Sequence, residues 1–319
     1  MGEGKHIDPA TGTETVGHEW DGIEELDTPM PRWWLLTLYA TIVFAIGYTI
    51  YYPAWPMIGG ATAGLSHWSS RDQLSAEMKS ESARRKPLML ALAQIPVERL
   101  PDDSKLMHAA IQGGAAAFRV NCVQCHGSGA AGGKGYANLN DDDWLWGGDL
   151  KTIYQTIDHG VRFAPDPATR VSQMPAFGRD GLLPPAQIGD VAAYVMTLSG
   201  AARPGASAAR GSLVFAATCA ACHGADGKGN RLLGAPNLTD RIWLYGGDRE
   251  TIVETLTNGR GGVMPAWGGR LDPATVKMLA AYVHSLGGGE KFVPDAEPQG
   301  EAQAEAGKVP APVKQNASR

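Results

Sequence analysis

The stretch Cys122-Val123-Gln124-Cys125-His126 decides how this chain folds. Cys-x-x-Cys-His is the spacing at which two thiols bond the vinyl groups of a haem while the adjacent imidazole binds its iron. Alone, the cysteine pair could also be half of a zinc site or a redox dithiol. The motif returns 97 residues later as Cys219-Ala220-Ala221-Cys222-His223, and the two pairs use all four cysteines. The duplication predicts two covalently bound c-type haems.

The repeat extends well beyond the cysteine motif. The matched segments are Gly114 with Gly211, Phe118 with Phe215, Asn138 with Asn237, Trp144–Asp149 with Trp243–Asp248, Met174–Gly178 with Met264–Gly268, and the apolar series Ile188, Val191, Ala192, Val195 and Leu198 with Val276, Leu279, Ala280, Val283 and Leu286. The apolar series has the spacing of one helix face. Asp272-Pro273 is a good helix start, an N-cap followed by proline at the first helical position. Each copy therefore predicts a helix, a haem-binding turn, a methionine loop and a terminal helix.

His126 and His223 are the expected proximal iron ligands because they complete the two cysteine motifs. For the sixth position, Met174 and Met264 are favoured because they occupy matched Met-Pro-Ala-aromatic-Gly loops. A thioether stabilises ferrous iron and so raises the reduction potential. Met196 and Met278 do not match each other and are interpreted as packing residues.

Two histidines remain as rival sixth ligands, His159 for the first haem and His284 for the second. A bis-histidine iron has a lower potential, which suits the final steps of respiration poorly. The aromatic residues Trp144, Trp146, Trp243 and Tyr245 are expected either to wall the haem pockets or to bind a propionate.

Residues 33–55 predict a membrane helix. No charged residue occurs from Trp33 to Tyr52, and twenty helical residues cover about 30 Å, the thickness of the hydrocarbon core. Aromatic residues crowd both ends of the run, as interfacial anchors do. A cleaved signal peptide is the competing interpretation, with Ala61-Thr62-Ala63 as its cleavage site. The acidic flank and the length of the run favour a retained anchor.

Charge is concentrated at the amino-terminal end. The net charge is −5, and residues 1–32 hold eight acidic and two basic side chains, so the rest is near neutral. There is no basic stripe, which argues against a nucleic acid partner. Residues 1–32 are polar and show neither a helical nor a strand period. The positive-inside count is ambiguous. Because c-type haem is attached outside the bacterial cytoplasmic membrane, residues 1–32 are expected in the cytoplasm and the haem domains in the periplasm, on a single-pass chain.

The expected fold class is all-α, with one N-terminal transmembrane helix followed by two tandem class I cytochrome c domains. The expected boundaries are a cytoplasmic segment at 1–32, the membrane helix at 33–55, a periplasmic linker at 56–107, cytochrome domains at 108–200 and 201–289, and a disordered tail without assigned function at 290–319. The two domains resemble class I c-type cytochromes, in which the first and last helices cross closely. Gly114 and Phe118 would then face the terminal helix of their own copy, with Ala193-Tyr194 and Ala281-Tyr282 as the opposing faces.

The stretch Asp21–Trp34, with the order of acidic segment, span, linker and two haem units, closely resembles the CcoP (FixP) family of subunits of cbb3-type cytochrome c oxidases. The resemblance implies a dihaem electron-transfer subunit that does not itself reduce oxygen. It would accept electrons from a periplasmic cytochrome c and pass them to the monohaem subunit CcoO and the haem–copper subunit CcoN. The resemblance also allows a small CcoQ-like subunit as a partner, and implies contact with membrane lipid. We expect the second haem unit to receive electrons and the first, tethered nearer the membrane, to pass them on.

Three other functions fit the motifs less well. A dihaem peroxidase needs one open iron position, which two matched methionine loops argue against. A free membrane-tethered electron shuttle would carry the same residues. The cytochrome subunit of a periplasmic dehydrogenase commonly shows three haem motifs, and this chain has two.

Overall fold

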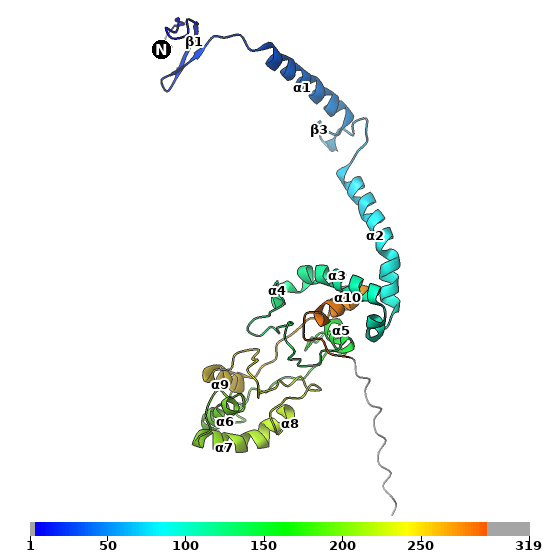
Figure 1. Cartoon of the computed structure of the whole chain (residues 1–319), viewed down its shortest axis with the longest axis vertical. Coiled ribbons are helices and arrows are strands. Elements are labelled where there is room, and N and C mark those ends of the chain that lie inside the picture. Colours follow the sequence, from blue (N-terminus) through cyan, green and yellow to red (C-terminus); the bar gives the residue numbers. More distant parts are fainter. Residues whose placement is uncertain (1–3, 292–319) are drawn as a thin grey trace, which may run out of the picture. The chain divides into compact units, whose positions relative to one another are not determined.

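The computed structural model describes residues 4–291, so most of the tail expected at 290–319 lies outside the described residues. The chain forms two compact units, with the boundary between Arg85 and Lys86. The elements are β1 (Thr15–Trp20), β2 (Ile23–Leu26), α1 (Arg32–Tyr51), β3 (Pro56–Met57), β4 (Gly60–Ala61), α2 (Ser70–Gln94), the 3-10 helix η1 (Val97–Asp102), α3 (Ser104–Asn121), α4 (Val123–His126), α5 (Leu150–His159), α6 (Pro185–Leu198), α7 (Ala206–Val214), the π-helical turn η2 (Phe215–Cys219), α8 (Ala220–His223), α9 (Arg249–Asn258) and α10 (Pro273–His284). The chain is mainly helical, which confirms the predicted fold class (Figure 1).

The first unit begins with an antiparallel hairpin, in which Trp20 pairs with Ile23 and Thr15 with Leu26. The prediction that residues 1–32 have no strand is therefore wrong. The turn residues Asp21 and Gly22 have φ of 51° and 86°. An Asp-Gly pair with both φ angles positive forms the two-residue turn that matches the twist of a hairpin, and this was the signal in the sequence.

Helix α1 follows the hairpin. It has a mean hydropathy of 1.6, none of its residues is buried, and within residues 4–291 it is the one helix long and apolar enough to cross a membrane. The helix ends at Tyr51, because Tyr52 is already extended and Pro53 cannot donate a helical hydrogen bond. The short strands β3 and β4 form a second hairpin after it.

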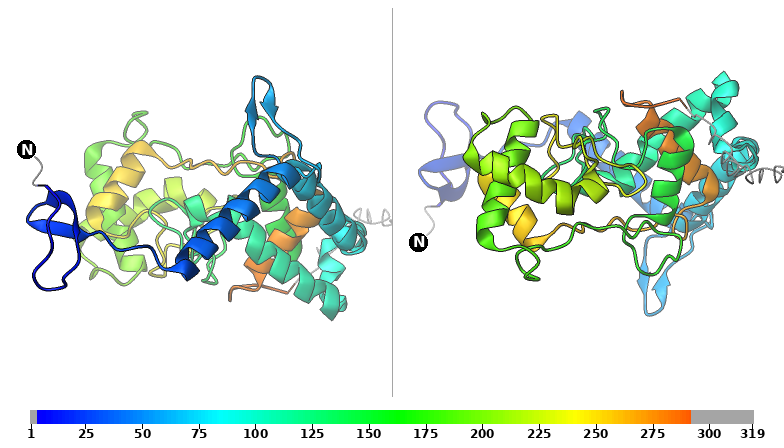
Figure 2. Two further views of the ribbon diagram at one scale, coloured as in Figure 1. Left: turned by 90° about the horizontal axis from the view of Figure 1, so that it is seen from above. Right: turned by 90° about the horizontal axis from the view of Figure 1, so that it is seen from below.

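The second unit contains two groups of helices, which we call the first and second lobes. The first lobe contains α3, α4, α5 and α10, and the second contains α6, α7, η2, α8 and α9 (Figure 1). In both views of Figure 2 the orange α10 lies with α3 at one end, while the yellow α9 lies with α6 and α7 at the other. Each lobe thus combines helices from both copies of the repeat.

The first and last helices cross closely, as predicted, but between copies rather than within one. A Cβ on Gly114 of α3 would lie 2.0 Å from the carbonyl oxygen of Met278 in α10, and Phe118 stacks on Tyr282 with ring centroids 5.3 Å apart. In the second lobe, a Cβ on Gly211 of α7 would lie 2.0 Å from the carbonyl oxygen of Asp190 in α6.

Chain connectivity explains this exchange. Only residues 199–205 join α6 to α7, so these neighbours can pack together at little cost in loop-closure entropy. Once α6 occupies the second lobe, α10 is the remaining terminal helix for α3. The Tyr194 and Phe215 rings pack 5.2 Å apart at the α6–α7 crossing, in the same way as Tyr282 and Phe118 do in the first lobe.

Candidate haem sites

His126 and His223, the two predicted proximal ligands, each have a ring orientation that suits metal binding. The short helices α4 and α8 end on Gly127 and Gly224, whose φ angles of 79° and 78° turn the chain back over the imidazole. His126 Nδ1 lies 3.0 Å from the Ala137 carbonyl oxygen, and His223 Nδ1 lies 3.1 Å from that of Pro236. A carbonyl only accepts, so Nδ1 carries the proton in each ring and the Nε2 lone pair is left for a metal.

The two cysteine pairs lie in different lobes, since Cys122 packs in the core around Phe118 and Cys219 in the core around Phe215. Burial raises the pKa of Cys122 and of Cys219 to about 11, whereas Cys125 and Cys222 are exposed. A high pKa disfavours the thiolate on which dithiol exchange depends. The placement therefore favours two separate attachment sites over a shared zinc site or a redox dithiol.

A cavity of about 720 Å³ in the second lobe is large enough for a cofactor. Cys219, Cys222 and His223 contribute to its lining, and so does Met174 from the other copy of the repeat. Most of the remaining lining is apolar; it includes Phe177, Val191, Val195, Phe215, Leu238, Trp243, Ile252 and Leu256. An apolar lining with convergent ligands is what a haem requires.

Met264 lies in the first lobe, packed against the cluster that contains Phe118 and Cys122. The structure therefore brings Met264 towards the first cysteine motif and Met174 towards the second. The rival histidines are both engaged: His159 Nδ1 lies 3.1 Å from an Asp166 carboxylate oxygen, and His284 Nε2 lies 2.8 Å from the Glu290 carbonyl oxygen. These contacts favour methionine in the sixth position of both sites.

The sequence analysis missed two arginines. Arg260 lines the second-lobe cavity and lies over Tyr245, with Cζ 4.3 Å from the ring centroid. Its Nη2 is buried without a hydrogen-bond partner among the described residues. Arg170 lies over Trp146 in the same way, at 4.8 Å, and burial lowers the pKa of its guanidinium. Both arginines precede a matched methionine by four residues, which was the available signal.

The other nitrogens of the Arg260 guanidinium are engaged: Nη1 pairs with a Glu254 carboxylate oxygen at 3.3 Å, and Nε donates to the Thr255 hydroxyl at 3.0 Å. The buried Nη2 that is left without a partner fits a haem propionate, because leaving such a donor unpaired is costly. The aromatic residues that were predicted to wall a haem pocket or to bind a propionate differ in their surroundings. The Trp144 indole nitrogen donates to the Gly288 carbonyl oxygen at 2.6 Å, so this N–H group is already occupied and is not available to a propionate. The Tyr245 ring packs against the Arg260 guanidinium, and both residues line the same cavity.

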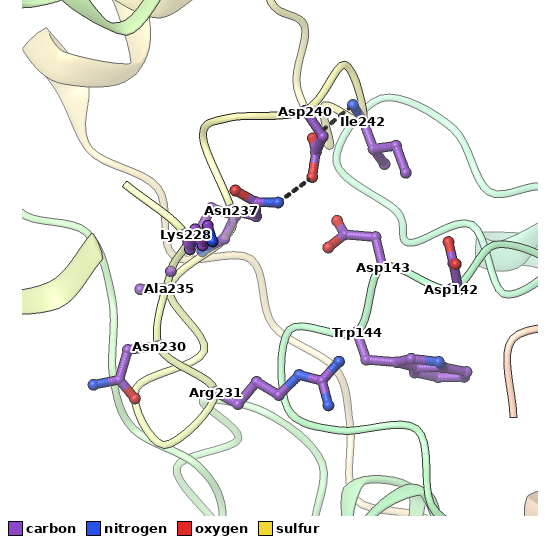
Figure 3. Close-up of a pocket in the computed structure, with 12 residues that line it drawn as sticks. Asp142, Asp143, Trp144, Lys228, Asn230, Arg231, Ala235, Asn237, Asp240 and Ile242 are labelled. Atoms are coloured by element: carbon purple, nitrogen blue, oxygen red, sulfur yellow. Dashed lines mark hydrogen bonds between the residues drawn. The ribbon is translucent and has the colours of Figure 1, made fainter. Parts of the chain in front are cut away.

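A second cavity, of about 540 Å³, is lined by acidic and basic side chains of both copies of the repeat. In Figure 3, Asp143 lies next to Asp240, which accepts hydrogen bonds from the Asn237 amide and from the Ile242 backbone N–H. Burial, followed by the negative charges of Asp240 and Asp141, raises the pKa of Asp143 to about 6. This carboxyl group therefore titrates close to neutral pH.

Comparison with known proteins matches two family models to the chain. Residues 12–59 match the N-terminal domain of the cbb3 cytochrome oxidase protein FixP, and residues 109–195 and 206–283 match subunit III of cbb3-type cytochrome c oxidase. The FixP subunit of Bradyrhizobium sp. strain ORS 278 is 54% identical over 91% of this chain and all of its own length.

Two further relatives agree. The CcoP subunit of Cereibacter sphaeroides is 54% identical over 86% of this chain and 95% of its own, and the FixP subunit of Rhizobium meliloti is 53% identical over 90% and 98%. These matches confirm the predictions of two cytochrome c domains and two covalently bound c-type haems. By identity and coverage, the chain belongs to the CcoP/FixP family of subunits of cbb3-type cytochrome c oxidases.

Proposed function

We propose that this chain is the dihaem electron-transfer subunit of a cbb3-type oxidase, anchored by α1 in the bacterial cytoplasmic membrane with its haem lobes in the periplasm. The observation that carries the proposal is the pair of oriented histidines, each with Nε2 free for iron and each in a lobe that also holds a methionine. His126 and His223 are the proximal ligands, Met174 and Met264 the sixth ligands, and the four cysteines the covalent attachments. Bound haem supplies an iron that alternates between the ferric and ferrous states.

The chain's own residues hold that iron in a fixed environment. The carbonyls of Ala137 and Pro236 hold the imidazoles in one tautomer and one orientation, so little reorganises on electron transfer. Apolar walls and thioether ligands raise the reduction potential. Arg260 is ion-paired to Glu254 through Nη1, and its buried, unpaired Nη2 would donate to a propionate in the second lobe. Because a histidine and a methionine would hold each haem iron, this chain would relay electrons and leave oxygen chemistry to another subunit.

The partners that we propose are CcoO and CcoN, a small CcoQ-like subunit, and a reduced periplasmic cytochrome c as the donor. Electrons enter at the second haem and leave from the first. Assembly with the other oxidase subunits is supported by the stretch Asp21–Trp34. This stretch lies within the FixP-type N-terminal match and leads into the helix α1.

The test is a mild-detergent purification through a tag on this subunit, with haem analysis and oxygen uptake driven by a reduced cytochrome c. Haem b together with haem c, and oxygen uptake that follows the tagged subunit, are expected. Haem c alone, with no partner and no oxygen uptake, would favour the shuttle or the dehydrogenase subunit instead. Protease protection in spheroplasts tests the orientation: the lobes should be cut from outside while residues 1–32 remain protected.

A further inference from the structure

We propose that Glu290 is a positioning residue for the second haem. Through Arg231 it holds the loop 230–236, and the carbonyl at the end of that loop fixes the imidazole of His223. This inference rests on the proposed ligation of the second haem by His223. It adds a residue, far along the chain from the cysteine motif, on which the orientation of that ligand depends.

All four polar atoms of Glu290 are engaged. Its carboxylate accepts two hydrogen bonds from the Arg231 guanidinium, at 2.8 and 2.9 Å, and a third from the Gly148 backbone N–H at 2.9 Å. Its own backbone N–H donates to the Gly148 carbonyl oxygen at 2.9 Å, and its carbonyl oxygen accepts from His284 Nε2 at 2.8 Å. A bidentate guanidinium–carboxylate pair fixes direction as well as distance. Glu290 is therefore a rigid link between the two copies of the repeat.

The glycines before Glu290 allow the chain to approach the first copy closely. The Trp144 indole nitrogen donates to the Gly288 carbonyl oxygen at 2.6 Å. A Cβ on Gly288 would lie 1.9 Å from the Asp141 carbonyl oxygen, so a larger residue would not fit there. The Glu290 side chain thus extends from a backbone that is itself held on the first copy.

The other end of the link is a wall of the second-lobe cavity. Arg231 belongs to the loop 230–236, and the last four residues of this loop line that cavity. A Cβ on Gly234 would lie 2.2 Å from Cζ2 of Trp146, so the loop also packs directly on the first copy. Its last residue, Pro236, supplies the carbonyl oxygen that lies 3.1 Å from His223 Nδ1.

A closed turn connects Arg231 to Pro236. Asn230 and Ala235 exchange backbone hydrogen bonds of 2.9 and 3.0 Å. Arg231 directly follows one partner of this pair, and Pro236 directly follows the other. Because the proline ring fixes φ, movement at Arg231 is passed on to the Pro236 carbonyl. Holding the guanidinium therefore holds the acceptor of the imidazole N–H.

The first haem site provides an internal comparison. His126 is oriented by the Ala137 carbonyl, eleven residues further on, whereas the matching interval in the second copy is thirteen residues. The shorter stretch 127–136 contains Lys134 but no arginine. Loss of Glu290 should therefore act on the second haem and leave the first unchanged.

The consequence concerns electron transfer at the second haem. A hydrogen bond from Nδ1 to a carbonyl fixes the tautomer, the orientation and the basicity of a metal-bound imidazole. An imidazole that keeps one orientation reorganises little when its iron changes oxidation state. Glu290 thus contributes to fast electron transfer without contact with the iron ligand.

The test measures hydrogen exchange of the imidazole N–H groups in the reduced, haem-loaded full chain with isotope-labelled histidine. The ring current of the haem moves the N–H resonance of a ligating histidine to a distinctive position. The Cys122→Ser/Cys125→Ser variant, which lacks attachment of the first haem, identifies the resonance of His223.

Breaking the link should speed exchange at the second haem alone. An exposed ion pair shifts a local equilibrium by up to about fivefold. We therefore expect Glu290→Ala to speed exchange of the His223 N–H by about three- to fivefold and to leave the His126 N–H unchanged. Arg231→Lys keeps the positive charge but loses the fork, and should have the same effect. Combining the two substitutions should add nothing to Glu290→Ala, because both break one interaction.

The matched control is Arg210→Lys. Arg210 also forms a bidentate pair, with Asp190 at 2.7 Å for both bonds, and its side chain is 63% exposed against 53% for Arg231. This pair joins α7 to α6 and does not involve the loop 230–236. Arg210→Lys should leave the exchange of both imidazole N–H groups unchanged.

Two outcomes would overturn the proposal: an unchanged exchange rate for His223 in Glu290→Ala, or an equal acceleration at His126, which would indicate general loosening. If Glu290→Ala does not fold, the conservative Arg231→Lys decides by the same criteria. Absence of any haem-shifted imidazole N–H from the second copy in the unmodified protein would instead refute the His223 ligation of the proposed function.

Discussion

Substituting Gly114 by alanine tests the α3–α10 crossing on which the first lobe depends. The new Cβ would lie 2.0 Å from the Met278 carbonyl oxygen and 2.7 Å from Tyr282 Cβ. Neither atom is at the end of a flexible side chain, so the helices must separate by about 1.5 Å to restore ordinary contact. Over-packing of this kind costs up to about 3 kcal/mol. Alanine gains about 1 kcal/mol of helix propensity over glycine. The expected net loss in the free energy of unfolding is about 2 kcal/mol.

The matched control is Gly189→Ala in α6, where the nearest atom to the new Cβ is the Arg249 Nη2 at 3.3 Å, the far end of a flexible side chain. Here helix propensity should dominate and stability should stay equal or rise by up to about 1 kcal/mol. The assay is guanidinium unfolding of the haem-loaded full chain in detergent, followed by the haem absorption band. If Gly114→Ala is as stable as Gly189→Ala, the close crossing inferred for α3 and α10 is refuted.

Three further predictions concern buried or partly buried charged groups. Lys277→Met should lower the free energy of unfolding by about 2–4 kcal/mol in a denaturant titration, because three backbone carbonyls would lose their donor. The Lys277 Nζ donates to the carbonyl oxygens of Leu92, Ala93 and Ile95 at 3.0, 2.8 and 2.5 Å. The exposed control Lys105→Met should have no effect. Asp143→Asn should raise the free energy of unfolding at pH 7 by about 1 kcal/mol, a value reduced because the side chain is half-exposed. A carboxyl group with a raised pKa costs stability as the pH rises from about 4 through about 6, and the substitution removes that cost. A gain in stability that persists at pH 3.5 would contradict this origin. Arg260→Met should lower the reduction potential of one haem in a redox titration by the equivalent of about 1–2 kcal/mol, because a positive charge near the iron is removed. The exposed control Arg179→Met should leave both reduction potentials unchanged. Equal effects of the two substitutions would argue against a propionate partner for Arg260.

Local chemistry made much of this protein predictable. The spacing of Cys122, Cys125 and His126 implies covalent haem attachment without reference to the rest of the fold, and its duplication excludes coincidence. The apolar face of α10 and its start at Asp272-Pro273 were also predictable: the Asp272 carboxylate accepts from the Thr275 backbone N–H at 3.1 Å. The hairpin at Asp21-Gly22 was predictable from its turn residues as well, although the polar composition around it shows no strand period.

Only the tertiary structure shows that α3 packs against α10 and α6 against α7. Gly114 and Gly211, Phe118 and Phe215, and Tyr194 and Tyr282 are chemically the same in the two copies, so the sequence fits packing within a copy as well as packing between copies. The short connection between α6 and α7 favours packing between copies, and the chain crossings that complete this arrangement exist only in the folded chain. The orphaned nitrogen of Arg260 likewise appears only once a cavity has formed around it. The sequence by itself determined which groups can bind haem, because covalent motifs act locally; only the tertiary structure decided which groups meet, because packing surfaces that are alike can be exchanged at little cost.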